Sequence, residues 1–233
     1  SHFMLRREFY QSVLKWILSL PRTPDIPFLI GVNGPQGVGK TTLTNYLVEQ
    51  LQQLNLNALS ISIDDFYLTR KQQQQLADGT DNPYLQQRGY PGTHDIELGQ
   101  KILGQLVSQQ TDFYLPRYNK SAFNGLGDRF DKKHHTLVTT KQDIVFIEGW
   151  MLGFQPVPAT PNQHLQTINN ELPKYKAWTQ YLNAFIYLKP VKTDQFIQWR
   201  VEAEENMKKT GKEGLSKKAI TAYAQLFLPA YQL

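Results

Sequence analysis

The chain has 233 residues, 40% of them apolar, with a formal net charge of +5 at pH 7 and no cysteine. This length and apolar content predict a folded domain with a sizeable core, and they exclude a disordered or membrane-embedded chain. The lack of cysteine excludes disulfide frameworks, thiolate catalysis and cysteine-ligated metal sites, and it fits a reducing, cytoplasmic location. No apolar run approaches the roughly 20 residues that span a bilayer, so no membrane partner is expected.

The basic residues are scattered along the chain, as in the isolated pairs Lys132-Lys133, Lys208-Lys209 and Lys217-Lys218. A nucleic-acid surface concentrates such residues on one stripe, so we expect an anionic small-molecule site and no nucleic-acid partner. No linker rich in Pro, Gly or Ser divides the chain. We therefore expect a cloning remnant at residues 1–4, followed by a single domain over residues 5–233. The sequence predicts no particular oligomeric state.

The first third of the chain has the pattern of a helix, a strand, a second helix and a second strand. These elements are expected at residues 5–20, 28–33, 40–54 and 58–63. A glycine-rich turn joins the first strand to the second helix. The order of strand, turn, helix and strand indicates the βαβ unit of a parallel sheet.

Shorter elements are expected in the remaining two thirds. Helices are predicted at 71–75 with a solvated face, at 96–107, from Thr193 or Asp194 to about Met207, and from a cap at Ser216. Strands are predicted at 113–118, 143–147 and 185–188. Residues 81–94 and 124–128 are rich in Gly and Pro and are expected to be loops.

The strongest motif runs from Gly34 to Thr41 and satisfies G-x-x-x-x-G-K-[ST] between a predicted strand and a predicted helix. Glycines let backbone amides approach phosphates, and the helix N-terminus adds partial positive charge. Lys40 supplies a charge for the β- and γ-phosphates, and Thr41 offers a hydroxyl to Mg²⁺. The expected cofactors are ATP and Mg²⁺. The expected nucleotide site comprises Gly34, Pro35, Gln36, Gly37, Val38, Gly39, Lys40, Thr41 and Thr42.

Acidic residues follow two of the predicted strands. Asp64 comes after the second strand, where ligands of parallel sheets bind, and it is expected to be the general base; capping of the next helix is the alternative. For Asp65 both roles stay open. Glu148 ends the strand at 143–147 as in a Walker B motif, so Thr41, Glu148 and Asp64 are expected to act on Mg²⁺.

Two loop segments combine turn formers with ionisable groups, at 88–95 and 115–121. Arg and Lys pair with carboxylates, so either segment could hold an anionic acceptor, while a solvated loop charge is the alternative for each residue. The candidates are Arg88, His94, Asp95, Arg117, Tyr118 and Lys120. Arg200, on the predicted helix ending near Met207, could act from a lid on the transferred phosphoryl group; an ion pair with Glu204 is the alternative.

Other P-loop classes fit less well. A GTPase needs Asn-Lys-x-Asp, but Ala122 stands where the Asp would follow Asn119-Lys120, and no Asp-x-x-Gly switch follows a strand. A mechanical ATPase usually needs a longer chain. We therefore expect a kinase that transfers the γ-phosphoryl group of ATP to a hydroxyl of a small molecule, with Lys40, Asp64 and Arg200 as catalytic residues. An ATP-binding regulator without phosphoryl transfer and an ATPase linked to nucleic acid stay as alternatives.

The combined motifs resemble the plant and cyanobacterial D-glycerate 3-kinase family, with its fungal and bacterial kinases. The wider group includes uridine kinase, phosphoribulokinase and pantothenate kinase. The resemblance rests on residues 34–42, SIDDFYLT at 62–69, RGYPGTHD at 88–95, LPRYNKSAFNGLGDR at 115–129, IEGWMLGF at 147–154, QWRVEAEENM at 198–207 and FLPAY at 227–231.

This resemblance implies a single P-loop kinase domain with a three-layer α/β fold and a parallel five-stranded sheet in the order 2-3-1-4-5. It also implies that Asp64 is the base and that Tyr118 touches the acceptor. Lys120 stands where pantothenate kinase has a histidine, which implies an acceptor with a nearby negative charge. The expected reaction converts D-glycerate to 3-phosphoglycerate, with pantothenate or a nucleoside as the alternative acceptor.

Overall fold

The chain folds into two compact units in a computed structural model. The first unit comprises Ser1–Ile61, Gln142–Trp150 and Leu182–Leu233, and the second comprises Ser62–Lys141 and Met151–Tyr181. The prediction of a single domain over residues 5–233 stays a prediction. The structure describes residues 2–35, 37–193, 196–206, 215–216 and 222–227, with side chains for residues 7–35 and 37–188.

The elements alternate between helices and strands through most of the chain. The α-helices are α1 (His2–Ser19), α2 (Lys40–Gln53), α3 (Arg70–Asp78), α4 (Ile96–Val107), α5 (Gln163–Glu171) and α6 (Lys176–Thr179). The short 3-10 helices are η1 (Ile63–Phe66), η2 (Pro83–Leu85), η3 (Lys132–His134) and η4 (Leu172–Tyr175). The strands are β1 (Phe28–Asn33), β2 (Ala58–Ser62), β3 (Phe113–Leu115), β4 (Tyr118–Asn119), β5 (Asp128–Arg129), β6 (Thr136–Val138), β7 (Ile144–Gly149), β8 (Ala184–Thr193), β9 (Phe196–Asn206), β10 (Leu215–Ser216) and β11 (Ala222–Phe227).

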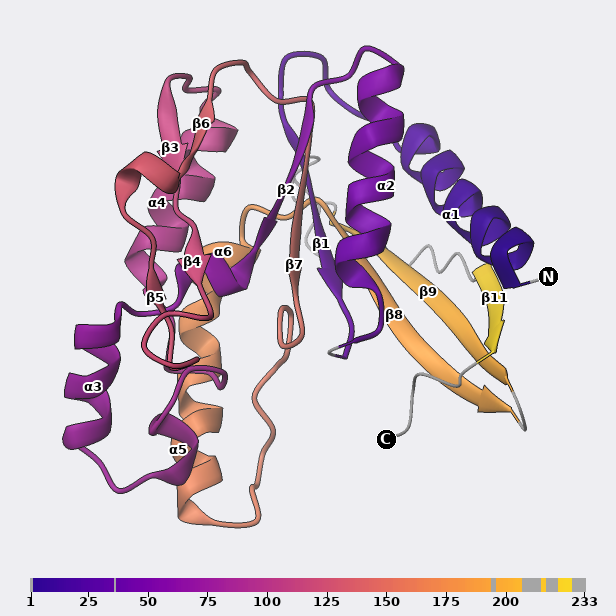
Figure 1. The fold of residues 1–233 in the computed structure, drawn as a ribbon. Coiled ribbons are helices and arrows are strands. Elements are labelled where there is room, and N and C mark those ends of the chain that lie inside the picture. Colours follow the sequence, from indigo (N-terminus) through magenta and orange to yellow (C-terminus); the bar gives the residue numbers. More distant parts are fainter. Residues whose placement is uncertain (1, 36, 194–195, 207–214, 217–221, 228–233) are drawn as a thin grey trace. The chain divides into compact units, whose positions relative to one another are not determined.

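The first unit is built on a sheet whose described strands run in the order β10-β9-β8-β1-β7-β2, with β11 also paired to β9 (Figure 1). β1 is parallel to both β7 and β8. β2 and β7 begin side by side, because the amides of Asp143 and Ile144 both donate to the carbonyl of Asn57. The four strands β2-β7-β1-β8 therefore form the parallel part of the sheet. Numbered along the chain, their order is 2-3-1-4.

The described sheet has four parallel strands where five were predicted, because β9, β10 and β11 are antiparallel. The helix predicted from Thr193 or Asp194 to Met207 is wrong, since residues 196–206 form β9. Apolar and polar residues alternate there as Ile-Gln-Trp-Arg-Val-Glu-Ala-Glu from residue 197 to residue 204. This period of two favours a strand over a helix. Asp194 and Met207 lie outside the described residues.

The last predicted helix is also wrong where the chain is described. Ser216, its expected cap, lies in β10, and Ala222–Phe227 forms β11 against β9. In the antiparallel register, Tyr223 pairs with Arg200 and Ala224 pairs with Trp199. Pairing with β9 gives this segment the backbone hydrogen bonds that a helix would otherwise have supplied internally.

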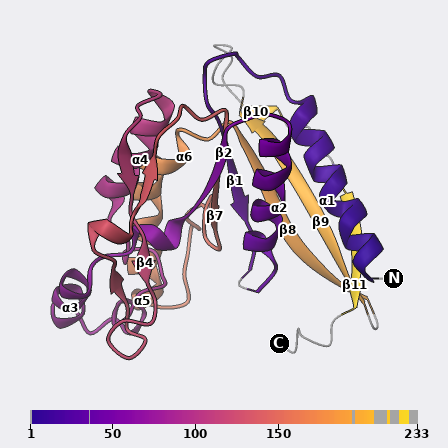
Figure 2. The ribbon, with the colours of Figure 1, turned by 45° about the horizontal axis from the view of Figure 1, so that its top comes forward.

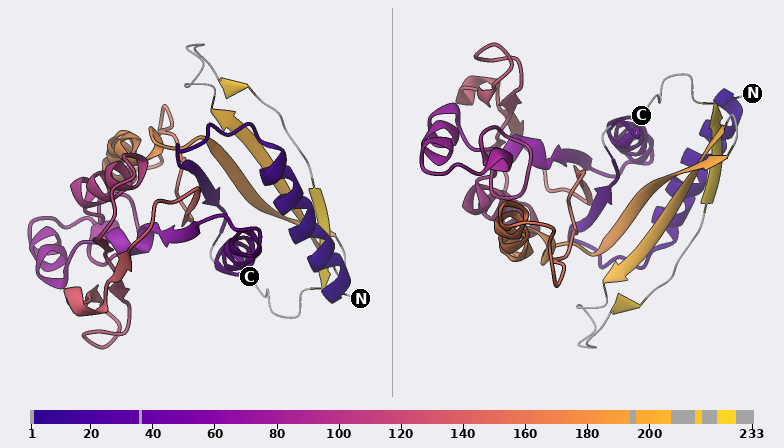
Figure 3. Two further views of the ribbon diagram at one scale, coloured as in Figure 1. Left: turned by 90° about the horizontal axis from the view of Figure 1, so that it is seen from above. Right: turned by 90° about the horizontal axis from the view of Figure 1, so that it is seen from below.

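Helices α1 and α2 cover one face of the parallel strands (Figure 2). Alternate residues of β1, β7 and β8 form one buried cluster with Leu43, Leu47 and Leu51 of α2. The predicted apolar stripe of α1 joins the same cluster, which explains why both helices form where the spacing placed them. α1 also runs beside β11, as the indigo helix and yellow strand of Figure 3 show.

The second unit combines helices with two small antiparallel pairs, β3–β6 and β4–β5. The strand predicted at 113–118 is two strands, because Pro116 has no amide proton for a ladder. Trp178 of α6 is fully buried, lies 5.2 Å from the ring of Phe66 and donates its indole proton to the Ile96 carbonyl at 2.9 Å. Gln73 of α3 is buried, although its segment was predicted to be a solvated face.

No described helix of either unit is long and apolar enough to cross a membrane.

Two glycines of α4 provide a matched test of this packing. A Cβ on Gly99 would lie 2.6 Å from Cε2 of Trp178, whereas the nearest atom to a Cβ on Gly104 is the Tyr181 hydroxyl at 3.5 Å. Gly99→Ala is expected to lower the free energy of unfolding by about 1–3 kcal/mol through overpacking. Gly104→Ala is expected to be neutral or to raise it by up to about 1 kcal/mol. Urea unfolding of both variants measures the difference, and equal effects would contradict the packing around Trp178.

Candidate functional site

The glycine-rich turn between β1 and α2 has the backbone of a phosphate-binding loop. Gly37 and Gly39 have φ values of 76° and 94°, in a region that glycine adopts without strain. Gly39 precedes the first turn of α2, and backbone amides at a helix N-terminus can bind an anion. The Lys40 ammonium donates to the carbonyls of Gly34 and Pro35 on this loop, the second at 3.0 Å. Gln36 lies outside the described residues.

Thr41 and Glu148 meet beside this loop. The Thr41 hydroxyl lies 3.0 and 3.2 Å from the two carboxylate oxygens of Glu148. The parallel register of β1 and β7 pairs Val32 with Glu148, one residue before the end of β1. A hydroxyl and a carboxylate are oxygen ligands that Mg²⁺ accepts, and Mg²⁺ usually takes few protein ligands beside phosphates and water. The two predicted metal residues of the first unit therefore fit a magnesium site.

Asp64 lies in η1, directly after β2, and pairs with Lys120. Its Oδ2 atom is 2.6 Å from the Lys120 ammonium, with the two side chains 25% and 60% exposed. The Ser62 hydroxyl accepts the Asp64 amide at 3.1 Å, so Ser62 caps η1. The next helix, α3, is capped by Thr69, so Asp64 does not have the capping role that was its alternative. The predicted base and a predicted acceptor residue lie in direct contact in the second unit.

Asp65, the neighbour of Asp64, is buried and holds the segment that contains two acceptor candidates. Its carboxylate accepts the Arg117 guanidinium and the Tyr118 amide, each at 3.1 Å. Burial raises the pKa of Asp65, and the positive charge of Arg117 opposes that rise. Arg117 also donates to the Thr136 hydroxyl at 2.9 Å. Arg117 is therefore an ion-paired residue and not a solvated loop charge.

His94 is buried among aromatic rings. Its Nδ1 atom lies 2.5 Å from the Tyr175 hydroxyl, and its ring stacks on Tyr67 at 4.5 Å. The Tyr175 oxygen also accepts the Gly92 amide at 3.0 Å. The Nε2 atom of His94 is buried and has no hydrogen-bond partner. Burial lowers the pKa of His94 to about 3, against the charge of Asp64, so the ring is neutral at pH 7.

Arg88 and Tyr118 lie together in the second unit. The Arg88 guanidinium donates to the carbonyls of Gly125 and Leu126, each at 2.7 Å, and lies 5.6 Å from the centre of the Tyr118 ring. Burial raises the pKa of Tyr118, which therefore keeps its proton at pH 7. Arg88 thus holds the glycine-rich loop at 124–128 beside the tyrosine that was predicted to touch the acceptor.

The last two predicted residues have other surroundings. Asp95 caps α4 by accepting the Leu98 amide at 3.0 Å, and it lies 3.8 Å from Arg129. Its described contacts are those of a structural cap. Arg200 lies on β9, a strand and not the predicted lid helix, so its approach to the transferred phosphoryl group stays a prediction.

Sequence reasoning missed two residues of the aromatic cluster. The Tyr67 hydroxyl is hydrogen-bonded to Asp64, and burial together with that charge raises the pKa of Tyr67. Its position three residues after Asp64, in the same quoted motif, was a signal that could have found it. Tyr175 lies 81 residues after its partner His94 and had no local signal.

The parallel sheet and the glycine-rich loop with Lys40, Thr41 and Glu148 define a P-loop nucleotide-binding protein. No protein-family model matches the chain. Curated relatives are informative. The chain is 35% identical to the chloroplastic D-glycerate 3-kinase of Arabidopsis thaliana over 88% of its own length, but it spans only 47% of that protein. It is 32% identical to the uncharacterized kinase mug58 of Schizosaccharomyces pombe, covering 94% of this chain and 85% of that protein.

The other comparisons agree. The probable ATP-dependent kinase TDA10 of Saccharomyces cerevisiae is 33% identical over 89% of this chain and 77% of its own length. The solved D-glycerate 3-kinase from Cryptococcus neoformans is 31% identical, with a TM-score of 0.69 over 81% of this chain and 73% of that chain. The chain therefore belongs to the family of P-loop kinases that contains D-glycerate 3-kinase and these fungal kinases, as its motifs predicted.

The buried, neutral His94 predicts a pH dependence of stability. Its pKa is about 3 in the folded chain and about 6.5 when unfolded, so unfolding takes up a proton below pH 6.5. The contribution of His94 to the free energy of unfolding is therefore fully present above pH 6.5 and is lost as the pH falls. The loss is about 2 kcal/mol between pH 6.5 and pH 5, at about 1.4 kcal/mol per pH unit.

Urea unfolding at several pH values measures this dependence. His94→Gln is expected to unfold at lower urea at pH 7.5 but to lose about 2 kcal/mol less than the wild type on acidification to pH 5. His134→Gln, at an exposed position, is the control and should keep the wild-type slope. The same slope in His94→Gln and in the wild type would contradict a neutral, buried His94.

Proposed function

We propose that the chain is an ATP-dependent kinase that transfers the γ-phosphoryl group of Mg·ATP to a hydroxyl of D-glycerate and yields 3-phosphoglycerate. The observation that carries this proposal is the partly exposed pair of Asp64 and Lys120, 2.6 Å apart, directly after β2. A hydroxy acid can give its hydroxyl proton to the Asp64 carboxylate, and its own carboxylate can pair with the Lys120 ammonium. Membership of the kinase family supports the same reaction.

In the proposed reaction the loop at 34–42 binds the nucleotide. Its backbone amides and Lys40 bind the β- and γ-phosphates, and Thr41 and Glu148 bind Mg²⁺. When bound, the metal ion neutralises charge on the phosphates. The Lys40 ammonium donates to two carbonyls of this loop, so it lies beside the loop proposed to bind the phosphates. This position supports the assignment. A single kinase domain over residues 5–233 is part of the proposal.

Asp64 is the proposed general base. One of its carboxylate oxygens accepts the proton of the attacking hydroxyl as the new O–P bond forms, and the bond from the γ-phosphorus to the bridging oxygen breaks to release ADP. Tyr67 and Lys120 both contact the carboxylate and hold its orientation. Asp64 is also proposed to act on Mg²⁺, as the sequence predicted.

The proposed acceptor site uses the remaining candidates in two ways. Lys120 binds the carboxylate of glycerate, while Tyr118 and His94 form hydrogen bonds to the acceptor. Arg88, Asp95 and Arg117 act indirectly, since each holds a neighbouring backbone segment or carboxylate. Arg200 is proposed to neutralise charge on the transferred phosphoryl group.

Substitution of the base tests the mechanism. Asp64→Asn keeps the size of the side chain but cannot accept the proton as a carboxylate does. Its kcat is expected to fall by about 10²–10⁴-fold, with little change in KM for ATP. Asp78→Asn, at the exposed end of α3, removes the same charge and should leave kcat unchanged. A loss smaller than about tenfold in Asp64→Asn would show that Asp64 is not the base.

An acceptor panel tests the substrate. ADP release from Mg·ATP is measured with D-glycerate, L-glycerate, pantothenate, uridine and ribulose 5-phosphate, and D-glycerate is expected to give the highest kcat/KM. Lys120→Met should raise KM for D-glycerate by about tenfold or more, because a charged hydrogen bond contributes about 1.5–3 kcal/mol. Lys133→Met, an exposed position outside the site, is the control.

The other outcomes identify the alternatives. Turnover with pantothenate or uridine alone would replace D-glycerate as the acceptor while leaving the kinase class. Nucleotide binding without turnover on any acceptor would favour an ATP-binding regulator.

A further inference from the structure

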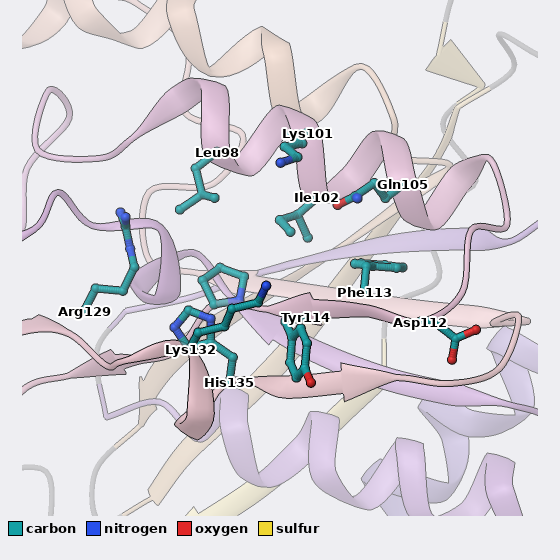
Figure 4. A pocket seen from close by; sticks show the side chains of 11 residues that line it. Leu98, Lys101, Ile102, Gln105, Asp112, Phe113, Tyr114, Arg129, Lys132 and His135 are labelled. Carbon is teal, nitrogen blue, oxygen red and sulfur yellow. The ribbon is translucent and has the colours of Figure 1, made fainter.

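Asp64 and the two residues that contact it, Lys120 and Tyr67, form a group called here the Asp64 cluster. The second unit contains a pocket whose lining shares no residue with this cluster. It has a volume of about 440 Å³ and lies between α4 and the β3 strand (Figure 4). This volume is within the range of small-molecule sites, roughly 300–1,000 Å³. None of the residues proposed to bind the acceptor lines this pocket. The pocket is therefore a candidate for a second ligand.

The pocket has an apolar floor. Leu98 and Ile102 are four residues apart on α4, so they lie on one face of the helix, and Figure 4 shows both extending toward β3. Phe113 of β3 lines the opposite side, and it is buried together with Ile102. Such a floor removes apolar surface of a ligand from water, which favours binding. The pocket is thus suited to a ligand with an apolar body.

The rim of the pocket is positively charged. Lys101, Arg129 and Lys132 line it, against a single carboxylate from Asp112. The Lys132 ammonium lies 5.1 Å from the centre of the Tyr114 ring, which keeps this cation at the rim. Lys101 and Lys132, together with an Arg129 that is ion-paired with Asp95, favour an anion over a neutral or cationic ligand.

Arg129 connects this pocket to the Asp64 cluster. Its guanidinium donates to the backbone carbonyl of Tyr67 at 3.1 Å and lies 3.8 Å from Asp95. Its Nε atom is buried and has no hydrogen-bond partner, so this group has a donor left to satisfy. A ligand that pairs with Arg129 therefore acts on the group that holds the backbone of Tyr67, and Tyr67 contacts Asp64.

We propose that this pocket is a regulatory site for a small organic anion with an apolar body. The anionic group pairs with Lys101, Lys132 and Arg129, and the body lies on Leu98, Ile102 and Phe113. Occupancy changes how the acceptor is bound, through the contact of Arg129 with Tyr67. This regulatory part rests on the proposed kinase function, whereas the binding part does not.

The binding part is tested by fluorescence titration of the full chain with 8-anilinonaphthalene-1-sulfonate, and with N-phenyl-1-naphthylamine, which lacks the sulfonate. The wild type should bind the sulfonate saturably and more tightly than the neutral probe. The double variant Lys101→Gln/Lys132→Gln should bind the sulfonate about five- to tenfold more weakly, because each exposed charge contributes up to about 1 kcal/mol. Its affinity for the neutral probe should not change.

The matched control is Lys71→Gln/Lys133→Gln, which removes the same charge from exposed positions outside the pocket. It should bind both probes as the wild type does. Equal affinity of the wild type and the Lys101/Lys132 variant for the sulfonate would overturn the site, as would equal weakening in the control. Both readouts are independent of phosphoryl transfer.

The regulatory part is tested by the KM for the acceptor at a saturating concentration of the sulfonate. We expect this KM to change by at least about twofold in the wild type. In the Lys101/Lys132 variant the same change should require a higher concentration of the probe. An unchanged KM with saturable binding would overturn regulation and leave the binding site. Lack of turnover on every acceptor would count against the kinase proposal, while the titration would still decide the pocket.

Discussion

The pairing of β1 with β7 is the constraint on which the nucleotide site depends. Parallel strands end at the same edge of a sheet, so the loop after β1 and the acid near the end of β7 are brought together by backbone hydrogen bonds. The register pairs Val32 with Glu148, and Thr41, at the start of α2, then reaches the Glu148 carboxylate. A shift of the register by one residue would turn the carboxylate to the other face of the sheet.

Two neighbouring aspartates have different surroundings, because only Asp65 is buried. Asp65 is 8% exposed and paired with a guanidinium and a backbone amide, so it organises the chain around Tyr118. Asp64 is more exposed and contacts the exposed Lys120 and the buried Tyr67. The exposed carboxylate can exchange protons with an acceptor, whereas removal of the buried one would leave Arg117 without its ion-pair partner.

The aromatic cluster of the second unit packs around the buried His94. His94 contacts the rings of Tyr67, Tyr175 and Trp178, and the indole of Trp178 is anchored to the Ile96 carbonyl. Large rings bury much apolar surface and have few rotamers, so such a cluster can hold Tyr67 against Asp64 at a small entropic cost. Arg129 contacts the same segment from the side of the α4 pocket, so one stretch of backbone is shared by the proposed acceptor and effector sites.

The sequence by itself determined the local elements and the chemical motifs. The apolar spacing of α2 and α4, the glycines of the loop at 34–41 and the acid after a buried strand are local signals, and the structure has these elements where they were predicted. The alternation in β9 was also a local signal, but the helix predicted there from a cap at Thr193 or Asp194 was wrong.

Only the tertiary structure decided which side chains meet. The contacts of Asp64 with Lys120 and of His94 with Tyr175 join residues 56 and 81 positions apart. The cap at Ser62, the structural role of Asp65 and the pocket beside α4 likewise depend on segments brought together by burial. Periodicity reports which face of an element is apolar, but partners are chosen by the packing of distant segments, because burial and hydrogen bonding are satisfied by the whole fold and not by neighbours in sequence.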